Sequence, residues 1–451
     1  MGRVAIGAPN RTTSRTRHLW LPAALFLVVL AIYLPTVARA SVNTDAHAAS
    51  VSAWRIATTG SPVMDGVDTS ELRGAQVLDQ WLVHRADGSL VHNRMGGVVA
   101  PAVPIYWLFG NAADPQNFSI MWGGVTGASF AAGAVVLFFL TLRRYVSTFT
   151  ATAAAGVLAL TTPTWTVSAN GLWPHSVTQF ALAGAAWALS RNNWLAVGVF
   201  LGAGITARPH LALVAAIVGI GMSWSRRDPK IAFAVGIPSL SAVGLLLLWN
   251  HWVFGVWNIQ GGYDDYVVQN ISGGEAGPSG GLLNLLGFLV SPDRGLLIWS
   301  PMILILLPAL IRSWSKVPAW TKWLLFGGIV YTLVQLRINS FTGGLGFYGY
   351  RHGLELLTCL APAIALSFDA AGSVARKLLG PIIGLQFAAI TVGASIDGFF
   401  VLLEDVWRDN SFWLGLRDQP AVLVPYLLLC VVGGLAAALI LERPRRQAPA
   451  P

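Results

Sequence analysis

An acidic side chain close to the first long apolar segment is the residue of this chain best placed to do chemistry. Asp45 lies in the stretch Ser41 to His47, on what should be the outer side of a membrane. A carboxylate there can take the proton of an attacking hydroxyl group, as a general base does. Spacing alone explains Asp45 equally well as a helix cap or a solvated loop charge.

Cationic side chains that could hold a phosphate follow at intervals along the chain. They are Arg94, Arg208, Arg294, Arg351 and His352. Arginine offers a planar fork of donors that suits phosphate oxygens. An arginine in hydrocarbon costs roughly 2.5 to 3.5 kcal/mol on insertion scales, so Arg208 and Arg351, which lie closest to apolar runs, are functional candidates.

Three of these arginines also have a purely structural explanation. Arg351 and Glu355 are spaced i, i+4, which would suit an ion pair on one helix face. Arg294, beside Asp293, could pin its own segment. Arg208 could be a charge that snorkels from a helix end.

Other polar residues could contact a substrate. They are His47, His92, His175, Asp264 and Asp265. His175 is equally consistent with a helix cap or an interface anchor, and the acidic pair with solvated turn residues. No metal-ligand spacing, phosphate-binding glycine loop or Ser/His/Asp order is present. The sequence therefore requires no cofactor, although the two adjacent aspartates could bind a divalent cation.

The composition is that of a membrane protein that spans the bilayer many times. Of the 451 residues, 55% are hydrophobic and only 11% are charged. Apolar runs of roughly 15 to 25 residues recur from end to end, and no stretch resembles a separate soluble domain. We therefore expect residues 1–451 to form one all-α transmembrane bundle. The two cysteines, Cys359 and Cys430, lie in apolar segments and indicate neither a disulfide framework nor a metal site.

The apolar runs predict about twelve spans that alternate from a cytoplasmic N-terminus to a cytoplasmic C-terminus. We expect them near residues 18–37, 118–142, 149–168, 176–190, 194–207, 210–224, 231–253, 295–311, 322–340, 353–371, 378–402 and 420–441. This order places most of the 29 basic residues in the cytoplasm and most of the 20 acidic residues outside. The net charge of +9 is therefore explained by topology, and no nucleic-acid partner is implied.

Two parts of this topology have alternatives. The first run could be a signal peptide, because Ala38-Arg39-Ala40 resembles a cleavage site, but its length favours an uncleaved span. The region 194–224 could form a tilted hairpin around Ala207-Arg208-Pro209-His210 that does not fully cross the membrane.

Two outer loops are long, at residues 41–117 and 254–294. The first should begin with a helix from Asp45 to Ala57 that stops at Gly60-Ser61-Pro62-Val63. Two apolar stretches, Gly96 to Phe109 and Gly281 to Val290, are too short to cross the membrane and should lie in its interface or re-enter it.

Several of these stretches together resemble the GT-C superfamily, multi-spanning glycosyltransferases that use polyprenyl-phosphate sugars. Asn43-Thr44-Asp45, then a helix and its Gly-Ser-Pro-Val stop, is similar to the first outer loop of the branch with protein O-mannosyltransferases and lipid A aminoarabinose transferases. Later stretches agree in order: His92 to Gly97, Leu172 to His175, Ile205 to Pro209, Leu289 to Leu296 and Gly343 to Arg351. Ala46 departs from the family, which commonly has a second acidic residue there; Asp65 or Asp68 could take its place.

The resemblance implies an enzyme in the cell membrane that transfers one sugar, for example mannose or arabinose, from a polyprenyl-phosphate carrier. The acceptor would be a hydroxyl group of a lipid, glycan or protein on the extracytoplasmic face. Asp45 would be the base, and the cationic residues would hold the donor phosphate. There are two alternatives: the chain could be a transporter or flippase of a lipid-linked sugar, or an inactive structural subunit of an envelope assembly. A transporter would place its charges near mid-membrane, whereas the acidic residues here gather outside.

Overall fold

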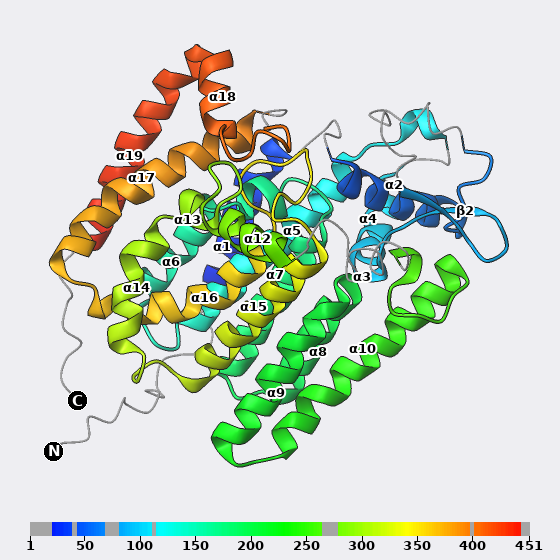
Figure 1. Cartoon of the computed structure of the whole chain (residues 1–451), viewed down its shortest axis with the longest axis horizontal. Helices are drawn as coiled ribbons and strands as arrows, with labels where there is room; N and C mark the ends of the chain where they lie inside the picture. The colour runs from blue at the N-terminus through cyan, green and yellow to red at the C-terminus, as the bar shows by residue number, and fades with distance from the viewer. Residues whose placement is uncertain are drawn as a thin grey trace.

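The computed structural model describes residues 20–37, 43–67, 81–110, 114–263, 278–396 and 401–442. Within these residues the chain is mostly helical, with 18 α-helices (Figure 1). Asp68, Asp264 and Asp265 lie outside the described residues, so the predictions made for them stay predictions.

Each apolar run that predicted a span coincides with a helix. The helices are α1 (Trp20–Tyr33), α5 (Met121–Leu142), α6 (Thr148–Leu160), α7 (Pro174–Ser190), α8 (Trp194–Ala207), α9 (Ala212–Arg226), α10 (Lys230–Phe254), α14 (Met302–Ser313), α15 (Ala319–Ile338), α16 (Leu354–Ser367), α17 (Ser373–Ser395) and α19 (Leu423–Glu442). Four described helices are long and apolar enough to cross a membrane: α5, α10, α17 and α19 with the turn before it. Helices α1, α6, α8 and α14 are apolar but shorter. Several helices of spanning length are what a multi-pass membrane protein requires.

Alternate helix ends meet, as an up-and-down bundle requires. At one end, Trp320 Nε1 donates to Tyr145 Oη at 3.0 Å, and Trp323 Nε1 donates to Ser225 Oγ at 2.8 Å. These bonds join the start of α15 to the connection after α5 and to the end of α9. At the other end, the amide of Asn284 donates to Leu336 O at 2.6 Å, where α15 finishes. The bundle therefore has two distinct ends, and the predicted site residue Arg208 lies at the second, where it contacts Gln335 near the end of α15.

Helix α2 (Thr44–Thr59) begins directly at the candidate base. The Asn43 side chain caps it by accepting from the backbone N–H of Asp45 at 2.8 Å, and Gly60 ends it with φ of +73°. The helix predicted for residues 45–57 is therefore confirmed. Its side chains from Ala46 to Trp54 are buried, so α2 is embedded in the fold rather than lying on its surface.

The two short apolar stretches form broken or isolated helices. The first becomes α3 (Gly96–Val99), a 3-10 turn and α4 (Val103–Phe109), and the second becomes α12 (Pro278–Val290). Trp107 is 73% exposed and Leu282 is 64% exposed, as suits segments that face lipid headgroups and acyl chains. Gly97 lets α3 approach the end of α8, since a Cβ there would lie 2.4 Å from Thr206 Oγ1.

A small hairpin departs from the all-α prediction. Strands β1 (Leu82–His84) and β2 (Leu90–His92) pair antiparallel, with Leu82 opposite His92. Three-residue strands are too short to carry a readable alternation. The usable signal was Asp87-Gly88 between two similar apolar stretches, because Asp-Gly favours a hairpin turn.

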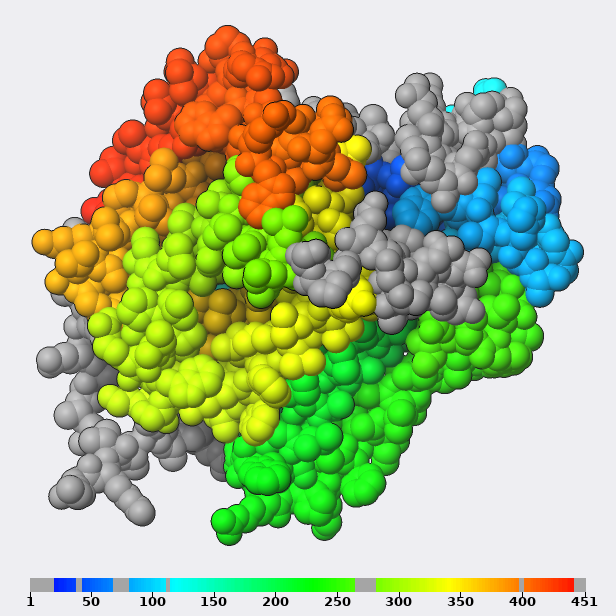
Figure 2. Space-filling model, in the orientation of Figure 1, coloured from blue at the N-terminus to red at the C-terminus, as the bar shows by residue number. Residues whose placement is uncertain are grey.

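The remaining described helices, α13 (Leu296–Trp299) and α18 (Ser411–Asp418), are short. Figures 1 and 2 show the C-terminal α17 and α19 at one edge of the molecule, in orange and red. The first loop, in blue, lies at the opposite edge. Helices α8, α9 and α10 project below it. The central helices of the bundle therefore lie between α17 and α19 at one edge and the first loop at the other.

The two ends of α10 give a test of topology. Ala86 N donates to Phe254 O, where α10 ends, whereas Lys230 begins the same helix of 25 residues. At 1.5 Å per residue this is about 37 Å, more than the roughly 30 Å hydrocarbon core. In a Cys430→Ser background, cysteines replacing Asp87 and Lys230 should react with an impermeant maleimide from opposite faces of sealed vesicles. Reaction of both from one face would contradict the arrangement.

Candidate functional site

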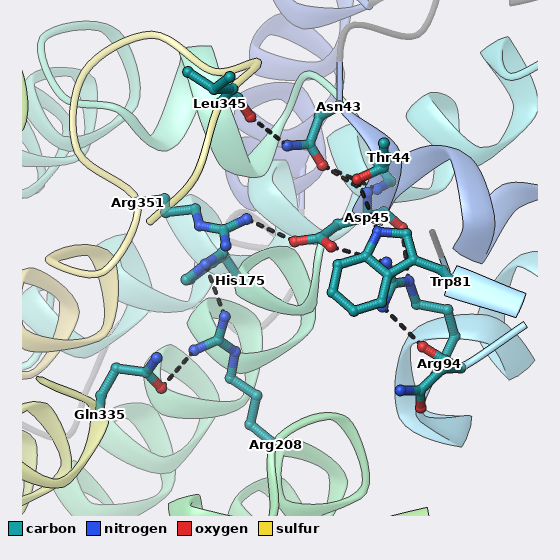
Figure 3. A network of polar contacts seen from close by, with 12 residues as sticks. Asn43, Thr44, Asp45, Trp81, Arg94, His175, Arg208, Gln335, Leu345 and Arg351 are labelled. Atoms are coloured by element: carbon teal, nitrogen blue, oxygen red, sulfur yellow. Dashed lines mark hydrogen bonds and ion pairs between the residues drawn. The ribbon is translucent and has the colours of Figure 1, made fainter. Parts of the chain in front are cut away.

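The Asp45 carboxylate lies between two arginines that come from distant parts of the chain (Figure 3). Arg94 Nη2 donates to Asp45 Oδ1 at 2.8 Å, and Arg351 Nη1 donates to Asp45 Oδ2 at 2.7 Å. The Asp45 side chain is 19% exposed. Each oxygen of the base candidate is thus occupied by a separate guanidinium group.

Arg94 is held on every side. Its Nε donates to Asp45 O at 3.1 Å, and its Nη1 donates to Asn93 O at 2.8 Å and to the Tyr263 hydroxyl. The guanidinium carbon lies 4.2 Å from the centre of the Trp81 ring. Trp81 in turn donates through Nε1 to Thr44 Oγ1 at 2.8 Å. Arg94 therefore fixes the segment after β2 against the start of α2.

Arg351 is held more loosely. Its guanidinium carbon lies 5.4 Å from the ring centres of both Trp173 and Phe347. Its Nε is buried and has no hydrogen-bond partner among the described residues. Gly343, with φ of +66°, covers this nitrogen, and a Cβ there would lie 3.0 Å from it. Arg351 therefore keeps donor capacity that the protein itself does not use.

The two arginines set the ionisation of Asp45. Burial by itself raises the pKa of the Asp45 carboxyl, but the charges of Arg94 and Arg351 and the hydrogen bond from Arg351 outweigh burial and hold that pKa at about 2. Asp45 is therefore ionised at neutral pH. While both arginines hold it, its affinity for a proton is too low for an effective general base, whose pKa should lie nearer the working pH.

A second polar group lies beyond His175, as Figure 3 shows. Arg208 donates through Nη1 to Gln335 Oε1 at 2.9 Å and to Tyr331 Oη at 3.3 Å, and its Nη2 lies 2.9 Å from His175 Nε2. His175 Nδ1 lies 2.9 Å from Glu355 Oε1. Glu355 therefore pairs with α7, and the predicted i, i+4 partner Arg351 contacts Asp45 instead.

Arg294 holds a loop. Its Nε lies 3.2 Å from Asp293 Oδ2, and its Nη1 donates to Phe347 O and Gly349 O at 3.1 Å each. The guanidinium carbon lies 4.1 Å from the Phe347 ring centre, and the residue is 1% exposed. These contacts match the pinning explanation and support the loop that carries Arg351.

Two histidines of the first loop, His47 and His92, are buried and neutral. Burial lowers the pKa of His47 to about 4 and that of His92 to about 3. His47 Nε2 and both ring nitrogens of His92 have no hydrogen-bond partner within the part of the chain that the structure describes. His352 is likewise buried, with both ring nitrogens unpartnered there and its ring 6.0 Å from that of His175. These atoms are available to polar groups of a substrate or to water.

A metal centre is not assembled by the described residues. Among them, no group of three or more His, Cys, Asp or Glu could hold an ion. Asp65, one substitute considered for the missing second acid, accepts from Leu90 N at 3.3 Å and so belongs to the hairpin. The predicted divalent cation stays a prediction, since Asp264 and Asp265 lie outside the described residues.

Several residues of the site were not singled out as site residues from sequence. They are Glu355, Tyr263, Trp81, Tyr331 and Gln335. Glu355 carried a usable signal, because an acid inside a predicted span is expensive unless it is paired. Tyr331 and Gln335 are spaced i, i+4 on one face of α15, but polar residues at that spacing also occur in helices without any site.

Comparison with known proteins identifies no family for the chain. No protein-family model matches the sequence, and no curated protein matches it. One similar solved structure is the archaeal oligosaccharyltransferase AglB from Archaeoglobus fulgidus in complex with an inhibitory peptide and a dolichol-phosphate. It has 12% identity and a TM-score of 0.48, over 94% of this chain and 56% of that chain. An oligosaccharyltransferase structure from the same organism with Zn and sulfate has 11% identity and a TM-score of 0.47, over 91% of this chain and 53% of that one. The chain thus spans about half the length of either structure.

The unequal contacts of the two arginines predict unequal roles in stability. Arg94→Gln should lower the free energy of unfolding by about 3 to 5 kcal/mol, because it removes several hydrogen bonds and leaves a partly buried carboxylate with one partner. Arg351→Gln should cost less than half as much. Arg408→Gln, in an exposed pair with Asp405, is the control and should cost about 0 to 1 kcal/mol. Denaturation in detergent measures all three, and equal losses for the first two would contradict the assignment.

Proposed function

We propose that this chain is a membrane glycosyltransferase that moves one sugar from a polyprenyl-phosphate carrier to an acceptor hydroxyl outside the membrane. The observation that carries the proposal is the Asp45 carboxylate held between Arg94 and Arg351, with Arg208 close by. A base candidate and cations within one small region are what transfer from a lipid phosphate needs.

The charges of the site favour an anionic ligand. Arg94, Arg208 and Arg351 face two buried or partly buried carboxylates, Asp45 and Glu355, which leaves one positive charge in excess. Among the residues that the structure describes, the acceptors in direct contact with Arg208 are neutral, namely Tyr331, Gln335 and His175. Its charge is thus free to pair with a phosphate oxygen, as guanidinium groups do bidentately.

Donor binding would activate the base. A donor phosphate competes with Asp45 for Arg351, the arginine with unused donor capacity. When Arg351 turns to the phosphate, Asp45 loses a contact that lowers its pKa, so its proton affinity rises. The carboxylate is therefore an effective base only after the donor has arrived.

The transfer step then balances in charge and atoms. The acceptor oxygen forms a bond to the anomeric carbon of the sugar, and its proton passes to Asp45. The bond between that carbon and the phosphate oxygen breaks, and its electron pair leaves with the polyprenyl phosphate. Arg208 and Arg351 stabilise the negative charge that develops on the leaving phosphate.

The membrane setting fits this chemistry. The site residues lie at helix ends, where a carrier's phosphate can meet arginine while its isoprenoid tail stays in lipid. We infer that the apolar helices form about twelve spans in the cell membrane with both termini in the cytoplasm and the site outside, in keeping with the basic residues of the opposite ends. A transporter would need its charges deeper in the membrane.

Substitution of the base separates binding from transfer. In purified full-length protein supplied with membrane extract and labelled polyprenyl-phosphate sugars, mannose and arabinose included, Asp45→Asn should reduce transfer by a factor of about 10² to 10⁴. Donor affinity should be unchanged or higher, because the variant lacks the internal competitor for Arg351.

The matched control is Asp87→Asn, an exposed acid in the same loop, which should transfer at the wild-type rate. Transfer by Asp45→Asn at the wild-type rate would refute the role of Asp45. Movement of the labelled lipid across the liposome bilayer, without transfer of its sugar to an acceptor, would instead favour a flippase.

A further inference from the structure

A buried line of polar contacts, from Glu355 through His175 to Arg208, connects α16 to the end of α8. We call these three residues the relay. Glu355 is the second residue of α16 and His175 the second residue of α7, and they are 1% and 0% exposed. Glu355 Oε1 lies 2.9 Å from His175 Nδ1 and accepts from Thr178 Oγ1 at 2.7 Å. His175 Nε2 lies 2.9 Å from Arg208 Nη2. Glu355, His175 and Arg208, which come from three helix ends, are thus connected in one line, and Thr178 binds Glu355 from the side.

The partners of His175 fix its tautomer. A carboxylate only accepts hydrogen bonds, so His175 Nδ1 must carry the proton that faces Glu355. A guanidinium only donates, so His175 Nε2 must present its lone pair to Arg208. A doubly protonated imidazole would set one N–H against another. The neutral Nδ1–H form alone satisfies both neighbours, in the way that carboxylates orient metal-binding histidines.

This arrangement orients Arg208 without using its charge. The guanidinium is held at Nη2 by His175 and at Nη1 by Gln335 and Tyr331, all of them neutral. A carboxylate in direct contact would compete with a phosphate for the arginine, as Asp45 does for Arg351. An imidazole between Glu355 and Arg208 provides the same rigidity and leaves the ion pair to the ligand.

We infer that Glu355 is a positioning residue, which acts through His175 to aim Arg208 at the phosphate of an isoprenoid-phosphate ligand. The inference rests on the proposed function, since it specifies how one cation of that site is held. It assigns a role to a buried acid that the transfer chemistry itself does not use. Glu355 has no contact with the reacting atoms in this assignment, and its effect passes entirely through the imidazole.

A double-mutant cycle on ligand affinity tests the relay. The probe is farnesyl phosphate, titrated against the full-length protein in detergent and followed by tryptophan fluorescence. Glu355→Gln removes the charge that selects the tautomer. His175→Gln keeps an amide oxygen in reach of Arg208 but loses the link to Glu355. Each single substitution should weaken farnesyl phosphate binding about tenfold. The affinity of the double variant should be no lower than that of the single variant with the lower affinity, because both substitutions break the same connection.

The control separates this role from a general effect on the fold. Gln386→Leu removes buried hydrogen bonds to Thr161 O and Trp299 O, away from the site. It should lower the melting temperature while leaving farnesyl phosphate affinity unchanged. Losses in the Glu355 and His175 variants that multiply in the double variant would overturn the relay.

Two further outcomes keep the relay and the proposed function distinguishable. Failure of wild-type protein to bind farnesyl phosphate would overturn the proposed function, and the relay with it. If the variants do not fold, nitrogen-15 spectra of wild-type protein with labelled histidine test the tautomer of His175 directly. Among the eight histidines, His175 should show a persistent neutral Nδ1–H form. An Nε2–H form assigned to His175 would overturn the relay while leaving the proposed function standing.

Discussion

The pairing of one carboxylate with two arginines is the constraint on which the rest of this structure depends. Arg94 lies 49 positions and Arg351 lies 306 positions from Asp45 in the chain. A partly buried carboxylate is costly unless it is paired, and so are the arginines. The segment after β2 and the loop before α16 must therefore meet at the start of α2. Capping of α2 by Asn43, whose amide also donates to Leu345 O at 2.6 Å, supports the same meeting.

Two ways of holding an arginine occur within this one site. Arg351 is paired directly with the Asp45 carboxylate, and its Nε has no partner among the described residues. A competing anion can therefore replace Asp45 as the partner of Arg351. Arg208 is held by neutral groups and reaches a carboxylate only through an imidazole. We propose that Arg351 changes its partner when the ligand binds, whereas Arg208 is already oriented toward the ligand before binding. The difference lies in which groups each guanidinium touches rather than in residue type.

Sequence patterns predicted the parts of the fold that depend on local chemistry. Apolar runs located the main helices, and the Gly60 stop located the end of α2, because hydropathy and helix stop signals act over a few residues. Asp45, Arg94, Arg208 and Arg351 were all chosen as candidates from their types and positions. Four helices of spanning length support the membrane assignment, while the count of about twelve spans stays a prediction.

Pairing between distant segments could not be predicted in the same way. The spacing of Arg351 and Glu355 favoured a local ion pair, but His175 and Asp45 compete for these side chains from other elements. Cation–π contacts of Arg94 with Trp81 and the roles of Tyr331 and Gln335 leave no trace in a local pattern. Such contacts depend on how helix ends are brought together, which is a property of the whole chain.

The most direct test of the central claim is an experimental structure of the protein with a bound isoprenoid phosphate. Our account predicts phosphate oxygens within hydrogen-bond distance of Arg351 and Arg208, with the Asp45 carboxylate released from Arg351 and open to an acceptor hydroxyl. A phosphate bound elsewhere, with the pair between Asp45 and Arg351 intact, would contradict it.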